Sequence, residues 1–309
     1  MPKLGQKVKN ALDETRILVL GTQVLLGFQY RGFMEPAFDK LPEHSKNLQM
    51  AGLFLLLAAL GALLLPAARH RLVERGWDST QFFYFTMNAL YLALLPFAAA
   101  LGLALFIGAE RVMGTAAAAV AGFGCAAGAG FFWYALPHKL RRPMQPEEDR
   151  MSKPKLEERI QHVLTEARIV LPGAQAMLGF QLAMMLMDAF EKLSSKARML
   201  HFVSLCFVAL TTVLLMAPAA FHRVAERGHD TDRLERFASG MVLAALVTLA
   251  AGLALDLAVV TERWCGSLRL GLVLAAVVFV ALMAGWFGLS LALRVAHGEP
   301  APRGSAAEG

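Results

Sequence analysis

Apolar and polar positions follow one another along this chain in long blocks, with apolar segments divided by short polar loops. Six of the apolar segments carry few or no ionisable groups and reach the roughly 20 residues that a bilayer crossing requires. These six segments are 48–68, 82–109, 112–137, 202–220, 237–261 and 268–293. Two further segments, 17–38 and 169–190, are apolar but contain polar residues. We therefore predict an all-α integral membrane fold with eight transmembrane helices.

The composition agrees with lipid as the main solvent. Hydrophobic residues make up 57% of the 309 residues, and the mean hydropathy is +0.50, which is too apolar for an ordinary soluble domain. The three cysteines share no metal or disulfide spacing, and the chain contains no nucleophile elbow, zinc motif or phosphate loop. We expect a protein that is not an enzyme and that uses no metal, no cofactor and no nucleic-acid partner.

The chain contains two similar copies of one sequence, with a constant offset of 152 residues. LDETRILVLGTQVLLGFQ (12–29) aligns without a gap to LTEARIVLPGAQAMLGFQ (164–181), and PAARHRLVERGWDST is repeated as PAAFHRVAERGHDT. A register held over a hundred residues indicates tandem duplication. Each copy holds four predicted spans, and an even number makes the copies parallel. The sequence therefore predicts two four-helix repeats related by a pseudo-twofold axis along the membrane normal.

Charge and proline mark the boundaries of these repeats. The first repeat covers 1–137, a charged linker covers 138–155, and the second repeat covers 156–296. The tail, 297–309, lacks large apolar residues and is expected to be disordered.

The formal net charge of +6 is a signal of membrane topology. Lysine and arginine gather in the N-terminus, in the linker and in the loops after the second and sixth spans, whereas the opposite loops are short and mixed. The positive-inside rule then places both termini and the linker in the cytoplasm of a bacterium, with the chain in the inner membrane. The expected partners are the lipid bilayer and, as an open question, further copies of the same chain.

The repeated signature reads Glu-x-Arg, then Gly-x-Gln-x-x-x-Gly-Phe-Gln, then Pro-Ala-Ala-x-His-Arg. This signature resembles a bacterial family of small four-span membrane proteins known as domain of unknown function 6328. The resemblance covers about 12–114 and 164–266, so it implies a fused pair of four-span units. It implies no activity, no cofactor and no catalytic residue.

Polar residues inside the predicted spans form the first group of candidate functional residues. They are Gln23, Gln29, Arg31, Glu35, Gln175 and Gln181. A glutamine in hydrocarbon needs a hydrogen-bond partner, so it either clasps a neighbouring helix or lines a path for water or ions. Arg31 and Glu35 are one helical turn apart and should pair, and the second repeat lacks both charges at the equivalent positions.

The second group lies at the predicted cytoplasmic helix ends. It comprises Glu14, Arg16, His70, Arg71 and Glu74 with their repeats Glu166, Arg168, His222, Arg223 and Glu226. One interpretation is a helix end that reaches toward anionic headgroups and pairs with Glu14 or Glu166 on a neighbouring helix. The other is proton sensing or anion binding by the histidine, since histidine titrates near neutrality.

Two further features bear on function. Asp256 aligns with Ala104 of the first repeat, and its distance from Glu262 places it shallowly on the outer side, as a minor candidate. The fourth and eighth spans are rich in small residues, which favours close helix contact at the junction of the repeats or between subunits.

The function favoured by this sequence is an ion channel or transporter for a cation or proton, with a path in or between the two bundles. The duplicated repeats and the intramembrane polar residues favour it, whereas the lack of a midplane carboxylate common to both copies does not. The alternative is a non-transporting membrane scaffold, or a module that binds lipid or a protein partner.

Overall fold

The computed structural model describes residues 4–74, 77–139, 151–152, 156–226 and 229–296. Almost all of these residues are helical. The long helices of the first repeat are α1 (Leu4–Gly32), α2 (Glu43–Leu72), α3 (Thr80–Met113) and α4 (Thr115–Gly130). Those of the second repeat are α6 (Leu156–Met184), α8 (Ser195–Val224), α9 (Asp232–Cys265) and α10 (Leu268–Met283). An all-α fold with four long helices in each repeat was predicted from the sequence.

Short elements complete the chain. They are the 3-10 turn η1 (Pro36–Phe38), the π-helical turns η2 (Phe131–Ala135) and η3 (Ala284–Leu289), the short helices α5 (Leu136–Lys139), α7 (Asp188–Glu191) and α11 (Ser290–Ala296), and the strands β1 (Asp78–Ser79) and β2 (Met151–Ser152). The two strands pair antiparallel, so the described part of the linker contacts the loop between α2 and α3. Residues 140–150, 153–155 and 297–309 of the predicted linker and tail lie outside the described residues.

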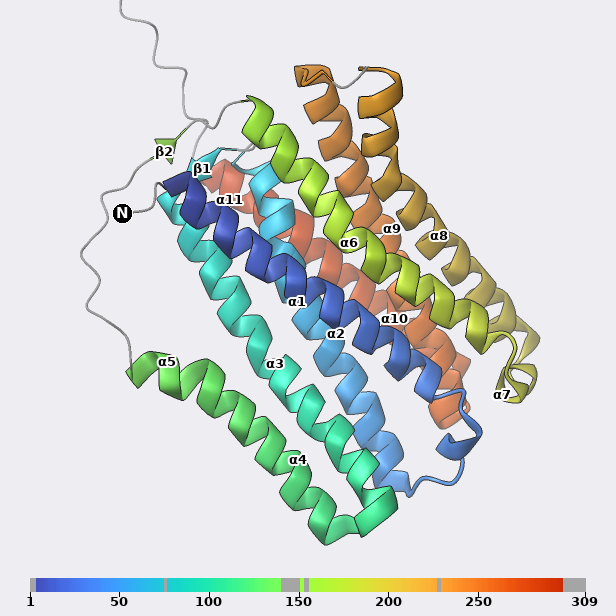
Figure 1. Cartoon of the computed structure of the whole chain (residues 1–309). Helices are drawn as coiled ribbons and strands as arrows, with labels where there is room; N and C mark the ends of the chain where they lie inside the picture. Colours follow the sequence, from blue (N-terminus) through green and yellow to red (C-terminus); the bar gives the residue numbers. More distant parts are fainter. Residues whose placement is uncertain (1–3, 75–76, 140–150, 153–155, 227–228, 297–309) are drawn as a thin grey trace, which may run out of the picture.

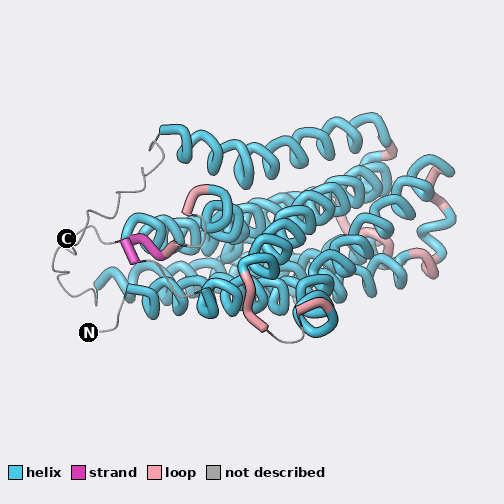
Figure 2. The backbone as a smooth tube through the Cα atoms, turned by 90° about the horizontal axis from the view of Figure 1, so that it is seen from above, coloured by secondary structure: helices cyan, strands magenta, loops and turns pink. Residues whose placement is uncertain are grey.

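Six of the eight long helices are long and apolar enough to cross a membrane: α2, α3, α4 with η2, α8, α9, and α10 with its continuation. The chain is therefore a multi-pass membrane protein by the length and composition of its helices. The remaining two, α1 and α6, carry the polar residues noted above, which lowers their hydropathy. Figures 1 and 2 show the long helices running roughly parallel, with α1 beginning and α11 ending at the same end of the bundle.

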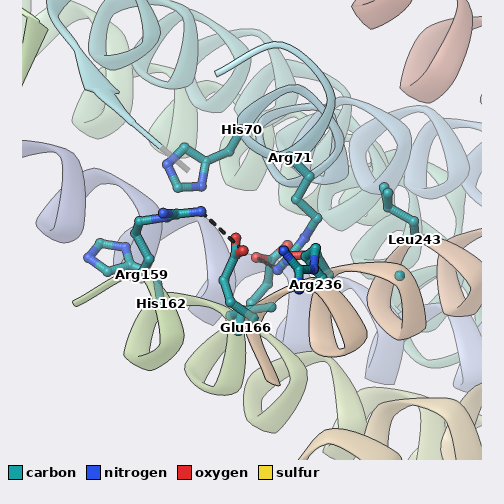
Figure 3. Close-up of a pocket in the computed structure, with 11 residues that line it drawn as sticks. His70, Arg71, Arg159, His162, Glu166, Arg236 and Leu243 are labelled. Atoms are coloured by element: carbon teal, nitrogen blue, oxygen red, sulfur yellow. Dashed lines mark hydrogen bonds and ion pairs between the residues drawn. The ribbon is translucent and has the colours of Figure 1, made fainter. Parts of the chain in front are cut away.

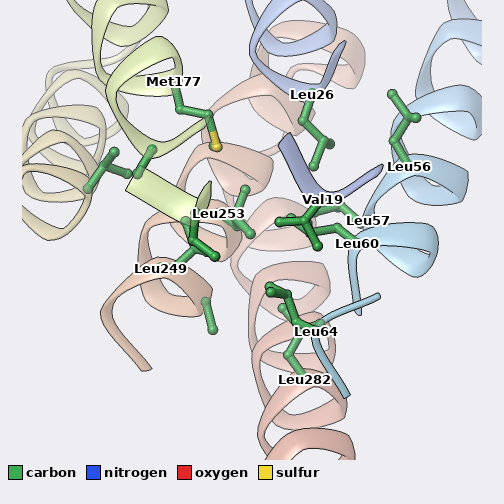
Figure 4. Close-up of a cluster of buried hydrophobic side chains, with 14 of the residues drawn as sticks. Val19, Leu26, Leu56, Leu57, Leu60, Leu64, Met177, Leu249, Leu253 and Leu282 are labelled. Carbon is green, nitrogen blue, oxygen red and sulfur yellow. The ribbon is translucent and has the colours of Figure 1, made fainter. Parts of the chain in front are cut away.

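The two repeats meet along α1 and α6, which lie side by side (Figure 1). Leucines from both repeats belong to one continuous core there, in which Leu57 and Leu60 of α2 lie close to Val19 of α1, with Leu253 of α9 on the other side of this group (Figure 4). The helix α9 also reaches α1, because the Tyr30 hydroxyl donates a hydrogen bond of 2.9 Å to the Leu253 carbonyl. The second repeat thus packs against the first through α6, α9 and α10.

The predicted pseudo-twofold relation is not confirmed by this packing, although the equivalent residues Phe28 and Phe180 do meet, with ring centroids 4.4 Å apart. A twofold axis exchanges equivalent residues, so a contact between Gly27 and Phe180 would require one between Gly179 and Phe28. A Cβ added at Gly27 would collide with the Phe180 ring, but one added at Gly179 would meet nothing within 4 Å. The physical reason is that α9 is central, with 67% of its apolar window buried, whereas the equivalent α3 is peripheral, with 28%.

Candidate functional site

A cluster of polar side chains lies inside the second repeat, where α6, α8 and α9 meet. His201 Nδ1 lies 3.0 Å from Asp256 Oδ1, and His201 Nε2 lies 3.1 Å from the backbone oxygen of Gln181. The Gln181 side-chain amide donates to Asp256 Oδ2 at 2.6 Å and to Ser204 Oγ at 2.8 Å. Ser204 Oγ in turn donates to the Gly252 carbonyl at 2.8 Å. The cluster therefore ties the three helices together.

All four side chains of this cluster are buried, with exposed fractions of 2% or less. Burial of an ionisable group among apolar helices is expensive, so its partners determine its protonation. A carbonyl oxygen can only accept a hydrogen bond, which means that His201 Nε2 carries a hydrogen. A hydrogen bond between His201 Nδ1 and Asp256 Oδ1 then requires a proton on one of these two atoms. The pair is either an imidazolium with a carboxylate or a neutral imidazole with a carboxylic acid.

The cluster sits near one end of the bundle. His201 is six residues from the start of α8, and Asp256 is nine residues from the end of α9. At about 1.5 Å per residue this places both side chains about 9–14 Å inside the helix ends. Asp256 was predicted from the sequence at this depth as a minor candidate, and His201 was not predicted as its partner.

The first repeat carries no ionisable pair at the equivalent place. His201 corresponds to Gln49, Ser204 to Gly52, and Asp256 to Ala104. Gln49 is almost fully buried and packs against Gly32, while the Gln29 amide lies near Gly52. Histidine and aspartate thus occur together in one repeat and are both replaced in the other, and this joint change is the signal in the sequence that could have revealed the pair.

The other intramembrane candidates are spread over different surroundings. Gln23 is fully buried between α1 and α6, where it packs against Gly173, and its amide nitrogen and oxygen have no hydrogen-bond partner in the described part of the chain. Its repeat, Gln175, is exposed. Arg31 and Glu35 form the expected ion pair at 2.9 Å, with both side chains more than a third exposed. The predicted residues therefore do not converge on one site, and only Gln181 belongs to the buried cluster.

A second polar site is a cleft between the repeats at the end of the bundle where α1 begins (Figure 3). The cleft has a volume of about 320 Å³. Its polar lining residues are His70, Arg71, Arg159, His162, Glu166, Glu235, Arg236 and Ser239. Arg71 forms an ion pair with Glu166, as one of the two pairings anticipated for this helix end, and Arg159 lies 3.0 Å from Glu235. These two pairs link α2 with α6 and α6 with α9.

The remaining helix-end candidates of the first repeat lie around this cleft, and those of the second repeat lie around the equivalent helix ends. Arg16 bonds Asp13 at 2.6 Å and the His162 carbonyl at 3.0 Å, and Glu74 accepts from Ser79 at 3.0 Å. The buried His70 stacks on Phe82 with ring centroids 4.7 Å apart.

In the second repeat the equivalent side chains are more open to the surroundings. His222 lies 3.6 Å from Asp230, with a side chain that is 25% exposed. Glu226 is half-buried and Arg168 is exposed. The first glutamate of the motif differs in the opposite sense, because Glu14 of the first repeat is exposed and its repeat, Glu166, is buried. The side chain of Arg223 lies outside the described part. The histidine motif is therefore enclosed between the repeats in one copy and open in the other.

Comparison with known proteins matches residues 2–137 and 149–290 to a family described as "Family of unknown function (DUF6328)". The chain belongs to this family, in two tandem copies. No curated protein and no solved structure matches the chain. The family membership agrees with a membrane protein built from apolar helices, and it brings no activity to either of the two polar sites.

Proposed function

We propose that this protein moves a cation, with the proton as the first candidate, through the helical bundle of the second repeat. The observation that carries the proposal is the His201–Asp256 pair, two buried ionisable groups whose Nδ1 and Oδ1 atoms lie 3.0 Å apart. Ionisable residues inside membrane spans are costly, and they often take part in proton relays. Gln181 keeps the carboxylate oriented toward the histidine through its own hydrogen bond.

The topology that goes with this proposal has eight spans, with both termini on the cytoplasmic side of a bacterial inner membrane. The 29-residue helices α1 and α6 support it, because about 43 Å of helix is long enough to cross a bilayer. The lysine and arginine distribution supports the orientation. In this topology the His201–Asp256 pair lies toward the outer side and the cleft of Figure 3 toward the cytoplasm.

A proton flux assay on purified protein in liposomes tests the proposal. The informative variant is His201→Gln with Asp256→Ala, because the first repeat places glutamine and alanine at the equivalent positions. We expect the unmodified protein to dissipate a pH gradient under a potassium diffusion potential and the double variant to lose that flux. The matched control is Arg31→Ala with Glu35→Ala, an exposed pair outside the second bundle, which should keep the flux.

The alternative function is a non-transporting scaffold or a module that binds lipid or a protein partner. The observation that favours it is that His201, Asp256 and Ser204 use their side-chain hydrogen bonds to tie the helices together, either with one another or with the backbone. Liposomes that carry the folded protein and pass no H⁺, Na⁺, K⁺ or Cl⁻ would contradict transport and leave the scaffold as the better account.

A further inference from the structure

The two repeats pack on each other through different faces of equivalent helices. On α1, the contact face carries Gln23 and Gly27. On α6, it carries Gly173 and Phe180, which correspond to positions 21 and 28 of α1. At 3.6 residues per turn the mean directions of the two faces lie about 130° apart around the helix axis, and the faces overlap at Phe28, whose ring lies 4.4 Å from that of Phe180. This contact is heterologous, and a heterologous contact leaves one face of each partner unmatched.

The unmatched face of the second repeat is an apolar groove between α6 and α8. Its volume is about 600 Å³. The lining residues are Leu164, Ala167, Arg168, Leu171, Val213, Leu215, Met216, Ala217, Pro218, Ala219, Ala220 and His222. Val213 and Met216 are 62% and 52% exposed. Gln175 and Gly179, which repeat the two contact residues of α1, are exposed on the same helix as Arg168.

The equivalent face of the first repeat, on α2, is covered by η3 of the second repeat. This contact indicates which helix would fit the groove. Val213 and Ala217 correspond to Gly61 and Leu65 of α2. There, Trp286 in η3 donates its indole N–H to the Gly61 carbonyl at 2.9 Å, and a Cβ at Gly285 would lie 3.5 Å from Leu65. The fourth helix of one repeat thus covers the second helix of the other.

The unmatched face of the first repeat carries α4 and η2, which share the features of α10 and η3. The π-helical turns η2 and η3 begin at residues 131 and 284, an offset of 153, and at this offset Trp133 corresponds to Trp286. The segment α4–η2 packs on α3 and has only 11% of its apolar window buried. On α1, Ile17 is 68% exposed, and Phe28 is still 53% exposed although its ring lies 4.4 Å from that of Phe180.

We propose that the α6–α8 groove of one chain receives the α4–η2 helix of a second copy, so that chains assemble head to tail. The contact between chains repeats the contact within a chain. Copies that share one orientation in a bilayer are related by rotation about its normal, so a repeated heterologous contact closes into a ring.

The molecule's own α4 cannot fill this groove without leaving α3. Gly114 is the single residue between α3 and α4, and Gly102 and Gly122 bring the two backbones so close that a Cβ at either would collide with the other helix. In Figure 1, α4 and α8 lie at opposite edges of the molecule. Glu166 pairs with Arg71 inside the chain, whereas its repeat, Glu14, is exposed on the surface.

Cysteine cross-linking of the full-length chain in membranes tests this assembly. In a background with Cys125, Cys206 and Cys265 replaced by alanine, the variant Ala129→Cys with Val213→Cys is treated with a short bifunctional thiol reagent. These positions repeat Leu282 and Gly61, which are in contact within the chain, and the variant keeps Trp133. We expect a ladder of covalent oligomers that ends at the size of the ring.

Two matched pairs control for geometry. Leu282→Cys with Gly61→Cys should cross-link within one chain and give no oligomer. Phe123→Cys with Val213→Cys, which uses an exposed residue on the same α4 helix, should give no ladder. The unmodified chain in lipid nanodiscs, measured by native mass spectrometry, should be oligomeric. A monomer there, or an Ala129–Val213 pair that gives only the chain mass because lipid or its own α4 fills the groove, would overturn the proposal.

Discussion

The buried His201–Asp256 pair leads to a quantitative prediction about stability. Asp256→Ala removes two hydrogen bonds to the carboxylate, one from His201 and one from Gln181. It also leaves His201 buried without its partner. His201→Gln places at position 201 the residue that the first repeat has there, but it leaves the carboxylate without an imidazole. Each single change therefore breaks a buried pair from one side.

The size of the coupling depends on which form the pair takes. Removing one partner of a buried ion pair costs about 3–5 kcal/mol, because the other charge stays buried and uncompensated. A neutral hydrogen bond between membrane helices is worth about 0.6 kcal/mol on average. Both side chains are 1% exposed or less, so in the ionised form either single change leaves a fully buried charge without its partner. The double variant should then be about 2 kcal/mol more stable than the sum of the two single losses predicts.

The assay is reversible unfolding in mixed micelles, with the denaturing detergent varied and helicity followed by circular dichroism for all four proteins. The free energies of unfolding give the interaction energy of the cycle directly. Single-variant losses that add to the double-variant loss within about 0.5 kcal/mol would refute the reasoning. An interaction energy of about 0.6 kcal/mol would instead identify the neutral hydrogen-bonded form.

Three further predictions use the same unfolding assay. Gln23→Leu should leave stability unchanged or raise it, because the buried Gln23 amide lacks partners in the described residues. Gln181→Leu should cost about 1–2 kcal/mol of stability through lost hydrogen bonds. Equal losses for the two variants would contradict this prediction. Gly27→Ala should cost about 1–3 kcal/mol of stability by overpacking against the Phe180 ring. Gly179→Ala, the equivalent change in the second repeat, should cost no stability. Similar effects at both positions would show that the repeats pack symmetrically. Arg31→Ala should cost less than about 1 kcal/mol, since the ion pair with Glu35 is exposed, and a larger loss would imply a buried role for it.

The sequence was sufficient for the elements of this fold because their signals are local. Uncharged segments of bilayer length predict helices, and the constant offset of 152 predicts two equivalent sets of four. The pairing of Arg31 with Glu35 follows from helical spacing, and that of Arg71 with Glu166 was one of the anticipated alternatives. Each of these inferences needs only the geometry of one helix or of two helix ends.

The arrangement of the repeats could not be predicted in the same way. Equivalent sequences suggest equivalent surroundings, so Gln23 and Gln175 were expected to behave alike. One is buried and the other is exposed, because the helix face that carries them meets a neighbour in only one repeat. His201 was missed for a related reason. A single histidine in a span has no pattern of its own, and its meaning depends on Asp256 of another helix, 55 residues away along the chain.

Duplication followed by divergence accounts for the asymmetry of both polar sites. In a ring of identical four-helix units every groove would be filled and every cluster would be the same. When two units are fused in one chain, every second contact in the ring lies within a chain and the others lie between chains. The two copies then have different surroundings, so their sequences can diverge. Here the second copy has the ionisable pair and the first has Gln49 and Ala104 in its place. If the chains close into a ring, ionisable and neutral bundles must alternate around it. A transport path would then be a property of each second repeat rather than of the ring's centre, and proton flux should persist in a chain whose assembly is blocked by filling the α6–α8 groove at Ala217.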